Sequence, residues 1–137
     1  MEEKRRSVTL VVSEDTLDKA FMPFMIAVTA ASMDADVHIF FTFMGLNILR
    51  KRYKPKLSGI MKIFTGIMLR KMKKIKIPGF DELLLQAGEL GVKLYACNTS
   101  MKMFDLKKED LIDGVEVVGA AKFLQLAMNS DTQLFVG

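Results

Sequence analysis

Short apolar runs rich in β-branched and aromatic residues recur along the chain, each bounded by turn-forming residues. Such continuous runs predict strands covered on both faces, because a half-exposed strand alternates apolar and polar positions. We expect strands over residues 7–13, 36–43, 92–97, 115–118 and 133–136.

Between these runs, apolar residues recur at intervals of three and four, which is the period of an amphipathic helix. Pro23 interrupts the first such stretch and predicts a kink, or a restart near Met22. We expect helices over residues 17–33, 60–72, 81–90 and 119–128, with shorter helical turns at 45–50, 101–104 and 107–112.

The alternation of strands with helices predicts an α/β fold: a three-layer sandwich around a mainly parallel five-stranded sheet. In such sheets, ligands bind outside the carboxyl ends of the strands. The length of 137 residues suits one domain, residues 1–137, and we expect a basic, mobile helical insertion at about 50–78.

Charge is unevenly distributed. The net charge is +4, but residues 50–76 hold eleven Lys or Arg and no acid, which leaves nine basic against sixteen acidic residues elsewhere. The basic helix within 60–76 has three interpretations: a solvated face over a core, a helix that docks a membrane surface or an acidic partner, or a nucleic-acid patch. Because no recognised nucleic-acid module is present, we expect no nucleic-acid partner.

Cys97 is the only cysteine, and it stands where the predicted strand 92–97 ends. Asn98, Thr99 and Ser100 follow as the start of a helix, whose free backbone N–H groups favour a thiolate. The alternative is a buried thiol that packs as a small hydrophobe. Single Cys and His residues do not make a metal cluster, and His38 lies within a strand, where a structural or interface role suits it better than catalysis.

The composition bears on location and assembly. No apolar run reaches the length of a membrane span, and Met1 to Arg6 lead into a strand pattern and not into the apolar segment of a signal peptide, so we expect a cytoplasmic protein. No Gly-rich phosphate loop follows the first strand, and we expect no cofactor. Half of the residues are hydrophobic, which favours self-association in a domain of this size.

Two motifs carry a resemblance to a known family. Phe40 to Leu46, Phe-Phe-Thr-Phe-Met-Gly-Leu, resembles the Phe-Phe-Thr-Phe-Trp-Gly-Leu signature of the DsrE/DsrF-like family, in its DsrE-related "peroxiredoxin-like" branch. Residues 90–103 resemble that branch's Gly-Val-(x)3-Ala-Cys-x-x-Ser-Met-x-x-Met pattern, and the run 110–119 is also typical. Met44 in place of Trp, and Phe104-Asp105 in place of Met-Gly, are departures that bear on substrate preference more than on fold.

The resemblance implies a flavodoxin-like α/β subunit that forms trimers or hexamers and works in sulfur relay. Carried over to this chain, it implies that Cys97 holds sulfane sulfur as a persulfide, or as a thiosulfonate, and passes it to a partner thiol. It leaves open whether the protein turns over as a sulfurtransferase or acts as a stoichiometric carrier. Asn98, Thr99, Ser100, Met101 and Met103 are the expected supporting residues, although Asn98 to Ser100 serve equally well as turn residues, and the methionines as packing.

The absence of a second cysteine argues for carriage over reduction, because nothing in the same chain can resolve a loaded Cys97 as a disulfide. Sulfur must then leave to another molecule, either a protein or a small sulfur compound. The alternative function is a non-catalytic oligomeric adaptor that docks an acidic partner or a membrane surface through the basic helix 60–76.

Overall fold

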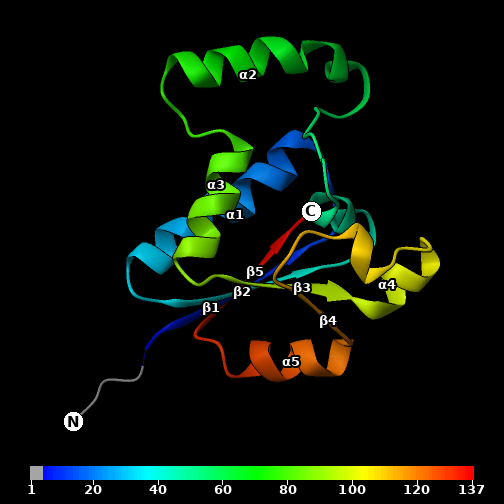
Figure 1. Ribbon diagram of the computed structural model, residues 1–137. Helices are drawn as coiled ribbons and strands as arrows, with labels where there is room; N and C mark the ends of the chain where they lie inside the picture. The colour runs from blue at the N-terminus through cyan, green and yellow to red at the C-terminus, as the bar shows by residue number, and fades with distance from the viewer. Residues whose placement is uncertain (1–4) are drawn as a thin grey trace.

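A computed structural model describes residues 5–137 as one sheet with helices on both faces (Figure 1). The strands are β1 (Ser7–Val12), β2 (Asp36–Phe41), β3 (Lys93–Cys97), β4 (Val115–Val118) and β5 (Thr132–Val136). The α-helices are α1 (Leu17–Ser32), α2 (Thr65–Lys74), α3 (Phe80–Glu89), α4 (Asn98–Met103) and α5 (Ala120–Met128). Three short 3-10 helices are η1 (Phe43–Leu49), η2 (Gly59–Phe64) and η3 (Lys108–Asp110).

All neighbouring strands are parallel, in the order β4-β3-β2-β1-β5. The helices α1 and α3 lie on one face of the sheet and α5 on the other (Figure 1). From β1 to β4, each new strand is added on the same side of the one before it, and the chain then returns to place β5 on the other side of β1. Because crossovers between parallel strands are right-handed, this reversal of direction places α5 on the opposite face from α1 and α3. The predicted three-layer α/β sandwich is confirmed. Its strand order differs from the 2-1-3-4-5 order of flavodoxin-like sheets, so the likeness to flavodoxin concerns the layers.

The two faces of the sheet have separate apolar cores. Alternate residues of β2 point to opposite faces, as the pleat of a strand requires. Phe41 stacks against Phe24 of α1 in the larger core, with ring centroids 6.0 Å apart. Phe40 stacks against Phe123 of α5 in the smaller one, with centroids 4.4 Å apart. The smaller core is the one that contains Cys97.

Helix α1 continues through Pro23, so the predicted restart near Met22 is wrong. Proline removes one backbone hydrogen bond from a helix interior, which normally disfavours it there. Here the Pro23 ring is fully buried beside Phe24, on the face that packs against the sheet. Burial of this apolar face offsets the lost hydrogen bond, a contribution that the local sequence does not reveal.

The helix predicted over 60–72 has a different start in the structure. Residues 59–64 form the 3-10 helix η2, and the α-helix α2 begins only at Thr65. The Thr65 hydroxyl donates to the Lys62 carbonyl at 2.8 Å and accepts the Leu57 N–H at 3.0 Å, which holds the junction between the two helices. Figure 1 shows this segment outside the sandwich, beyond the ends of α1 and α3. Its mobility stays a prediction.

Candidate functional site

Cys97 is the last residue of β3, and α4 begins at the next residue. It therefore lies at the carboxyl edge of the parallel sheet, where a following helix exposes unpaired backbone N–H groups. Its side chain packs in the smaller core with Phe40, Tyr95, Val118 and Phe123, and 9% of the residue is exposed. The thiol is thus enclosed mainly by apolar groups, with a small area open to solvent.

Two hydroxyl groups lie beside the thiol. Thr42 follows β2 directly, and Ser100 lies in the first turn of α4. Their hydroxyl oxygens are 3.0 Å apart, and the backbone N–H of Phe43 donates to the Ser100 hydroxyl at 3.0 Å. The Ser100 oxygen accepts the hydrogen bond from Phe43, and its own hydroxyl proton can then point toward the thiol of Cys97.

These groups determine the protonation of Cys97. Burial raises the pKa of the thiol, because the charged form loses hydration. Hydrogen bonds from the backbone N–H and hydroxyl of Ser100, the hydroxyl of Thr42 and the backbone N–H of Thr99 outweigh burial, so that the pKa is lower than that of an ordinary thiol. At neutral pH the thiolate is therefore more populated than in a free cysteine.

A tight turn after β2 holds Thr42 in place. The Thr42 N–H donates to the Val12 carbonyl at 3.0 Å, and the Gly45 N–H donates to the Thr42 carbonyl at 2.9 Å. A Cβ atom at Gly45 would overlap the Val12 carbonyl, so that only glycine fits. Phe43 has a φ of 48°, a left-handed conformation that is uncommon for a residue with a large side chain. The Phe-Thr-Phe-Met-Gly run thus has a structural purpose: it turns the chain sharply beside Cys97.

The expected supporting residues do not all meet at the thiol. Ser100 and the backbone of Thr99 contact Cys97, whereas the Thr99 hydroxyl donates to the Asn98 side chain at 3.3 Å. Asn98 lies next to Gly119, just before α5. Met101 packs in the larger core, away from the Cys97 cluster, and Met103 is exposed.

Sequence reasoning missed Thr42 as a member of the site. The signal was present, because Thr42 lies within the Phe40–Leu46 motif and follows a predicted strand that neighbours the Cys97 strand. What was missing is the pairing of β2 with β3, which brings Thr42 and Ser100 together across 58 positions of sequence.

His38 lies toward the opposite end of β2. Its Nδ1 is 2.9 Å from the Tyr95 hydroxyl. Burial lowers the pKa of the imidazole; Asp36 raises it to a smaller extent, and the positive charge of Lys93 lowers it further. The ring therefore stays neutral at neutral pH and takes part in a hydrogen bond between two neighbouring strands, separate from the groups around Cys97.

Among residues 5–137, no three His, Cys, Asp or Glu side chains gather into a group that could hold a metal ion. Within the same residues, no helix combines the length and the apolar character needed to cross a bilayer.

Comparison with protein families and relatives gives a consistent result. The model of the DsrE/DsrF/DrsH-like family matches residues 4–61 and 56–135. The sulfur carrier protein DsrE2 of Allochromatium vinosum is 32% identical, over 99% of this chain and 100% of its own. The uncharacterized protein YrkE of Bacillus subtilis is 30% identical, also over 99% of this chain and 100% of its own.

Two solved structures share the fold. The ychN protein of E. coli matches with a TM-score of 0.66 at 17% identity, over 96% of this chain and 99% of that one. A protein of unknown function from Methanobacterium thermoautotrophicum matches with a TM-score of 0.60, again at 17% identity and over 96% and 99% of the two chains. At this level of identity, the likeness concerns the fold alone.

Proposed function

This chain belongs to the DsrE/DsrF/DrsH-like family, and on that premise we propose that it carries sulfane sulfur on Cys97 and passes it to a partner thiol. A full-length relative named as a sulfur carrier supports a role in sulfur relay. The observation that carries the proposal for this chain is the position of Cys97 at the end of β3, where Ser100, Thr42 and Thr99 place hydrogen-bond donors around its sulfur and lower the pKa of the thiol.

Loading begins with the thiolate, which is the nucleophilic form of cysteine. The Cys97 sulfur attacks the outer sulfur of a persulfide or polysulfide donor: the new sulfur–sulfur bond forms as the donor's bond breaks, and the electron pair leaves on the donor thiolate. With tetrathionate, the thiolate attacks one of the two central sulfurs: the central sulfur–sulfur bond breaks, a thiosulfonate stays on Cys97, and thiosulfate leaves with the electron pair. Neither reaction needs an external oxidant or reductant.

The donors around Cys97 also suit the product. A persulfide is an anion at neutral pH, and the N–H and hydroxyl groups that stabilise the thiolate can stabilise this anion at the adjacent sulfur. The small exposed area of Cys97 limits access by water and favours a small donor or an extended partner segment. A thiolate of the acceptor then attacks the outer sulfur, takes it away and restores the Cys97 thiolate.

The acceptor must be another molecule, because the chain has a single cysteine. We expect protein thiols or small sulfur compounds as donors and acceptors. The same chemistry serves a catalytic sulfurtransferase and a stoichiometric carrier, which differ in whether the loaded protein turns over.

We also propose that the protein self-associates through the side of the sheet that bears α5. The edge strand β5 presents Phe135, which is 69% exposed, and the turn beside Cys97 presents Phe43 and Met44. Apolar groups this exposed are typical of an interface between subunits. An interface here would lie next to Cys97, in keeping with the trimers or hexamers that the family resemblance implies.

Intact-protein mass spectrometry after brief incubation with polysulfide, thiosulfate or tetrathionate tests the carrier proposal. We expect wild type to gain one or more sulfur atoms, or a thiosulfonate, that dithiothreitol removes, and Cys97→Ser to gain nothing. Met103→Leu is the matched control, because it removes an exposed sulfur of α4 but keeps the thiol.

Transfer is tested by adding a thiol acceptor to the loaded protein and following the appearance of persulfide on the acceptor. Loading of Cys97→Ser would contradict the mechanism. Wild type that stays unmodified with every donor would leave Cys97 as a packing residue and favour the adaptor function, in which the basic helix within 60–76 docks a partner without sulfur chemistry.

A further inference from the structure

Residues 59–76, here called the basic segment, comprise η2, α2 and the two residues after α2. No side chain of η2 or α2 is buried, although both helices contain many apolar residues. The segment lies beyond the ends of α1 and α3, at the opposite end of the molecule from α5 (Figure 1). Its surface is therefore open to a partner and is distant from the smaller core around Cys97.

The outer side of the segment carries an apolar stripe. Ile60, Ile63 and Ile67 follow one another at helical spacing and are 82%, 75% and 60% exposed. Phe64 and Ile75 are exposed as well. Large apolar side chains gathered on one helical segment and left in water indicate a surface that is covered in the functional state.

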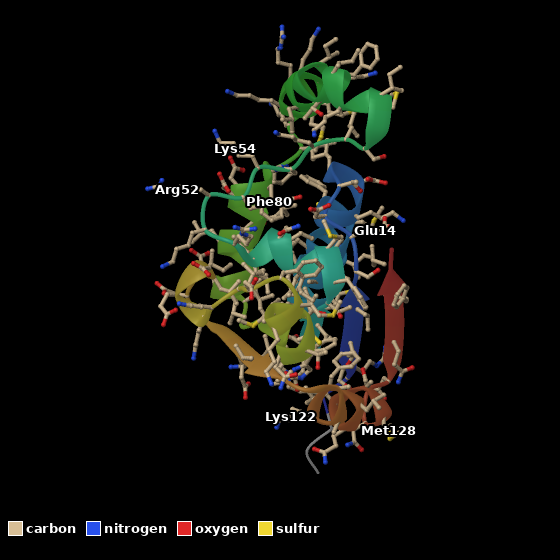
Figure 2. The ribbon with its side chains drawn as sticks, turned by 90° about the vertical axis from the view of Figure 1, so that its right-hand side faces the viewer. Glu14, Arg52, Lys54, Phe80, Lys122 and Met128 are labelled. Carbon is tan, nitrogen blue, oxygen red and sulfur yellow. The ribbon has the colours of Figure 1, made fainter. Side chains whose placement is uncertain are left out.

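Cations accompany this stripe. Lys62, Arg70, Lys71, Lys73, Lys74 and Lys76 all belong to the segment, and no acidic residue occurs between positions 50 and 76. None of these cations forms an ion pair within residues 5–137. Figure 2 shows nitrogen-tipped side chains that project from the helix away from the body, with Arg52 and Lys54 on the chain that leads into it. The segment thus combines unpaired positive charge with exposed apolar groups.

The inner side of α2 faces the body across two hollows. Met68 and Met72 line an apolar hollow of about 380 Å³ together with Phe21 and Met22 of α1. Leu69 lines a neighbouring hollow that also reaches Phe21. Because these residues face α1, the isoleucine stripe and most of the cations are left for a partner.

We propose that the basic segment docks the protein on the surface of an anionic lipid bilayer. The lysines and Arg70 contact lipid phosphates and carboxylates, and Ile60, Ile63 and Ile67 enter the boundary between headgroups and acyl chains. A bilayer surface offers negative charge and an apolar layer side by side. A nucleic acid offers charge without a place for three isoleucines, and an acidic protein would need a groove matched to the stripe.

Vesicle co-sedimentation of the full chain tests this proposal, with phosphatidylcholine vesicles that either contain or lack phosphatidylserine. We expect binding only to the vesicles with phosphatidylserine, and weaker binding at high salt, because mobile ions screen the attraction. The variant Arg70→Gln/Lys71→Gln/Lys74→Gln should weaken binding on the order of 100-fold.

Three further variants make the test specific. Lys107→Gln/Lys108→Gln/Lys122→Gln is the matched control, because it removes the same charge from exposed positions outside the segment and should bind nearly as wild type does. Ile60→Ser/Ile63→Ser/Ile67→Ser should also lose binding, although its charge is unchanged. Cys97→Ser should bind as wild type does, which separates this proposal from the sulfur-carrier function. Circular dichroism confirms that each variant is folded.

The proposal is overturned if wild type binds neither vesicle, or binds both equally. It is also overturned if the charge variant of the segment binds no more weakly than the matched control. Binding to polyglutamate or to RNA at lower concentrations than to the vesicles would identify a different partner for the segment and overturn the bilayer as its occupant.

Discussion

The thiol of Cys97 is subject to two opposing influences, and single residues decide between them. Apolar neighbours such as Phe40 and Phe123 favour the neutral thiol, because they exclude the water that a thiolate needs. Ser100, Thr42 and the N–H of Thr99 supply donors that replace this water. A nucleophilic sulfur can therefore be kept in a mainly apolar setting, which suits a persulfide that must be shielded from side reactions.

Removal of one donor should make Cys97 less reactive. We expect Thr42→Val to raise the pKa of the thiol, so that the rate of alkylation by iodoacetamide at pH 7 falls about tenfold. The pH profile of the rate should shift to higher pH, because the thiolate then forms only at lower proton concentration. Ser100→Ala should act in the same direction, and should also destabilise the fold by about 1–3 kcal/mol by leaving the Phe43 N–H without its partner.

Thr99→Val is the matched control for these variants. Its hydroxyl bonds to the Asn98 side chain, and only its backbone N–H reaches the thiol, which the substitution retains. Its alkylation profile should therefore coincide with that of wild type. If the alkylation profile of Thr42→Val also coincides with that of wild type, the Thr42 hydroxyl does not stabilise the thiolate.

At the scale of elements, the turn between β2 and η1 brings Thr42 to the helix that follows β3. The turn depends on the close approach of Gly45 to the Val12 carbonyl and on the positive φ of Phe43. These features cost conformational freedom, and the hydrogen bonds of the Thr42 backbone to Val12 and Gly45 compensate for that cost. The site is thus built from the ends of neighbouring elements and not from one local stretch.

Gly45→Ala should disrupt this turn. Its Cβ atom would overlap the Val12 carbonyl, and the strands cannot separate without loss of the β1–β2 pairing, so we expect the free energy of unfolding to fall by about 3 kcal/mol. Urea denaturation followed by circular dichroism measures this change.

Gly88→Ala provides the comparison for Gly45→Ala, because it adds the same methyl group in α3, where no atom lies within 4 Å of the new Cβ. We expect the free energy of unfolding to be unchanged or to rise by about 0.5 kcal/mol, because alanine favours a helix more than glycine does. Equal effects of the two substitutions would show that the close approach at Gly45 is not what the turn requires.

At the scale of the whole molecule, the three-layer arrangement separates the surfaces that we assign to different tasks. The carboxyl edge of the sheet holds Cys97, the α5 side bears exposed apolar residues, and the basic segment lies at the far end beyond α1 (Figure 1). Because the basic segment lies apart from both Cys97 and the proposed subunit interface, binding to a bilayer would leave self-association and sulfur exchange unobstructed.

Self-association should depend on Phe135. We expect wild type to sediment as an oligomer in analytical ultracentrifugation and Phe135→Glu to shift toward the monomer, because a buried, unpaired carboxylate is costly at an interface. Leu85→Glu is the control, since Leu85 is 65% exposed but lies on α3, which covers the other face of the sheet. A wild-type monomer, or equal effects of both variants, would contradict an interface at β5.

The sequence by itself determined the order of the strands and main helices along the chain, the position of Cys97 and the family. Apolar periodicity and turn residues are local properties, and they located all five strands, the main helices and Cys97 at the end of β3, within a few residues of their observed bounds. The motifs around Phe40 and Cys97 identified the family, because both occur in order and at the right separation.

Tertiary structure decided what depends on contacts between distant residues. The pairing of β2 with β3 brought Thr42 to Ser100 and Cys97, burial allowed α1 to continue through Pro23, and the return of β5 to the far side of β1 set the strand order. The outward direction of the isoleucine stripe likewise depends on which side of α2 faces α1 across the hollow lined by Met68 and Met72. These features could not be read from the sequence, because each is stabilised by packing or hydrogen bonding that local propensity does not encode.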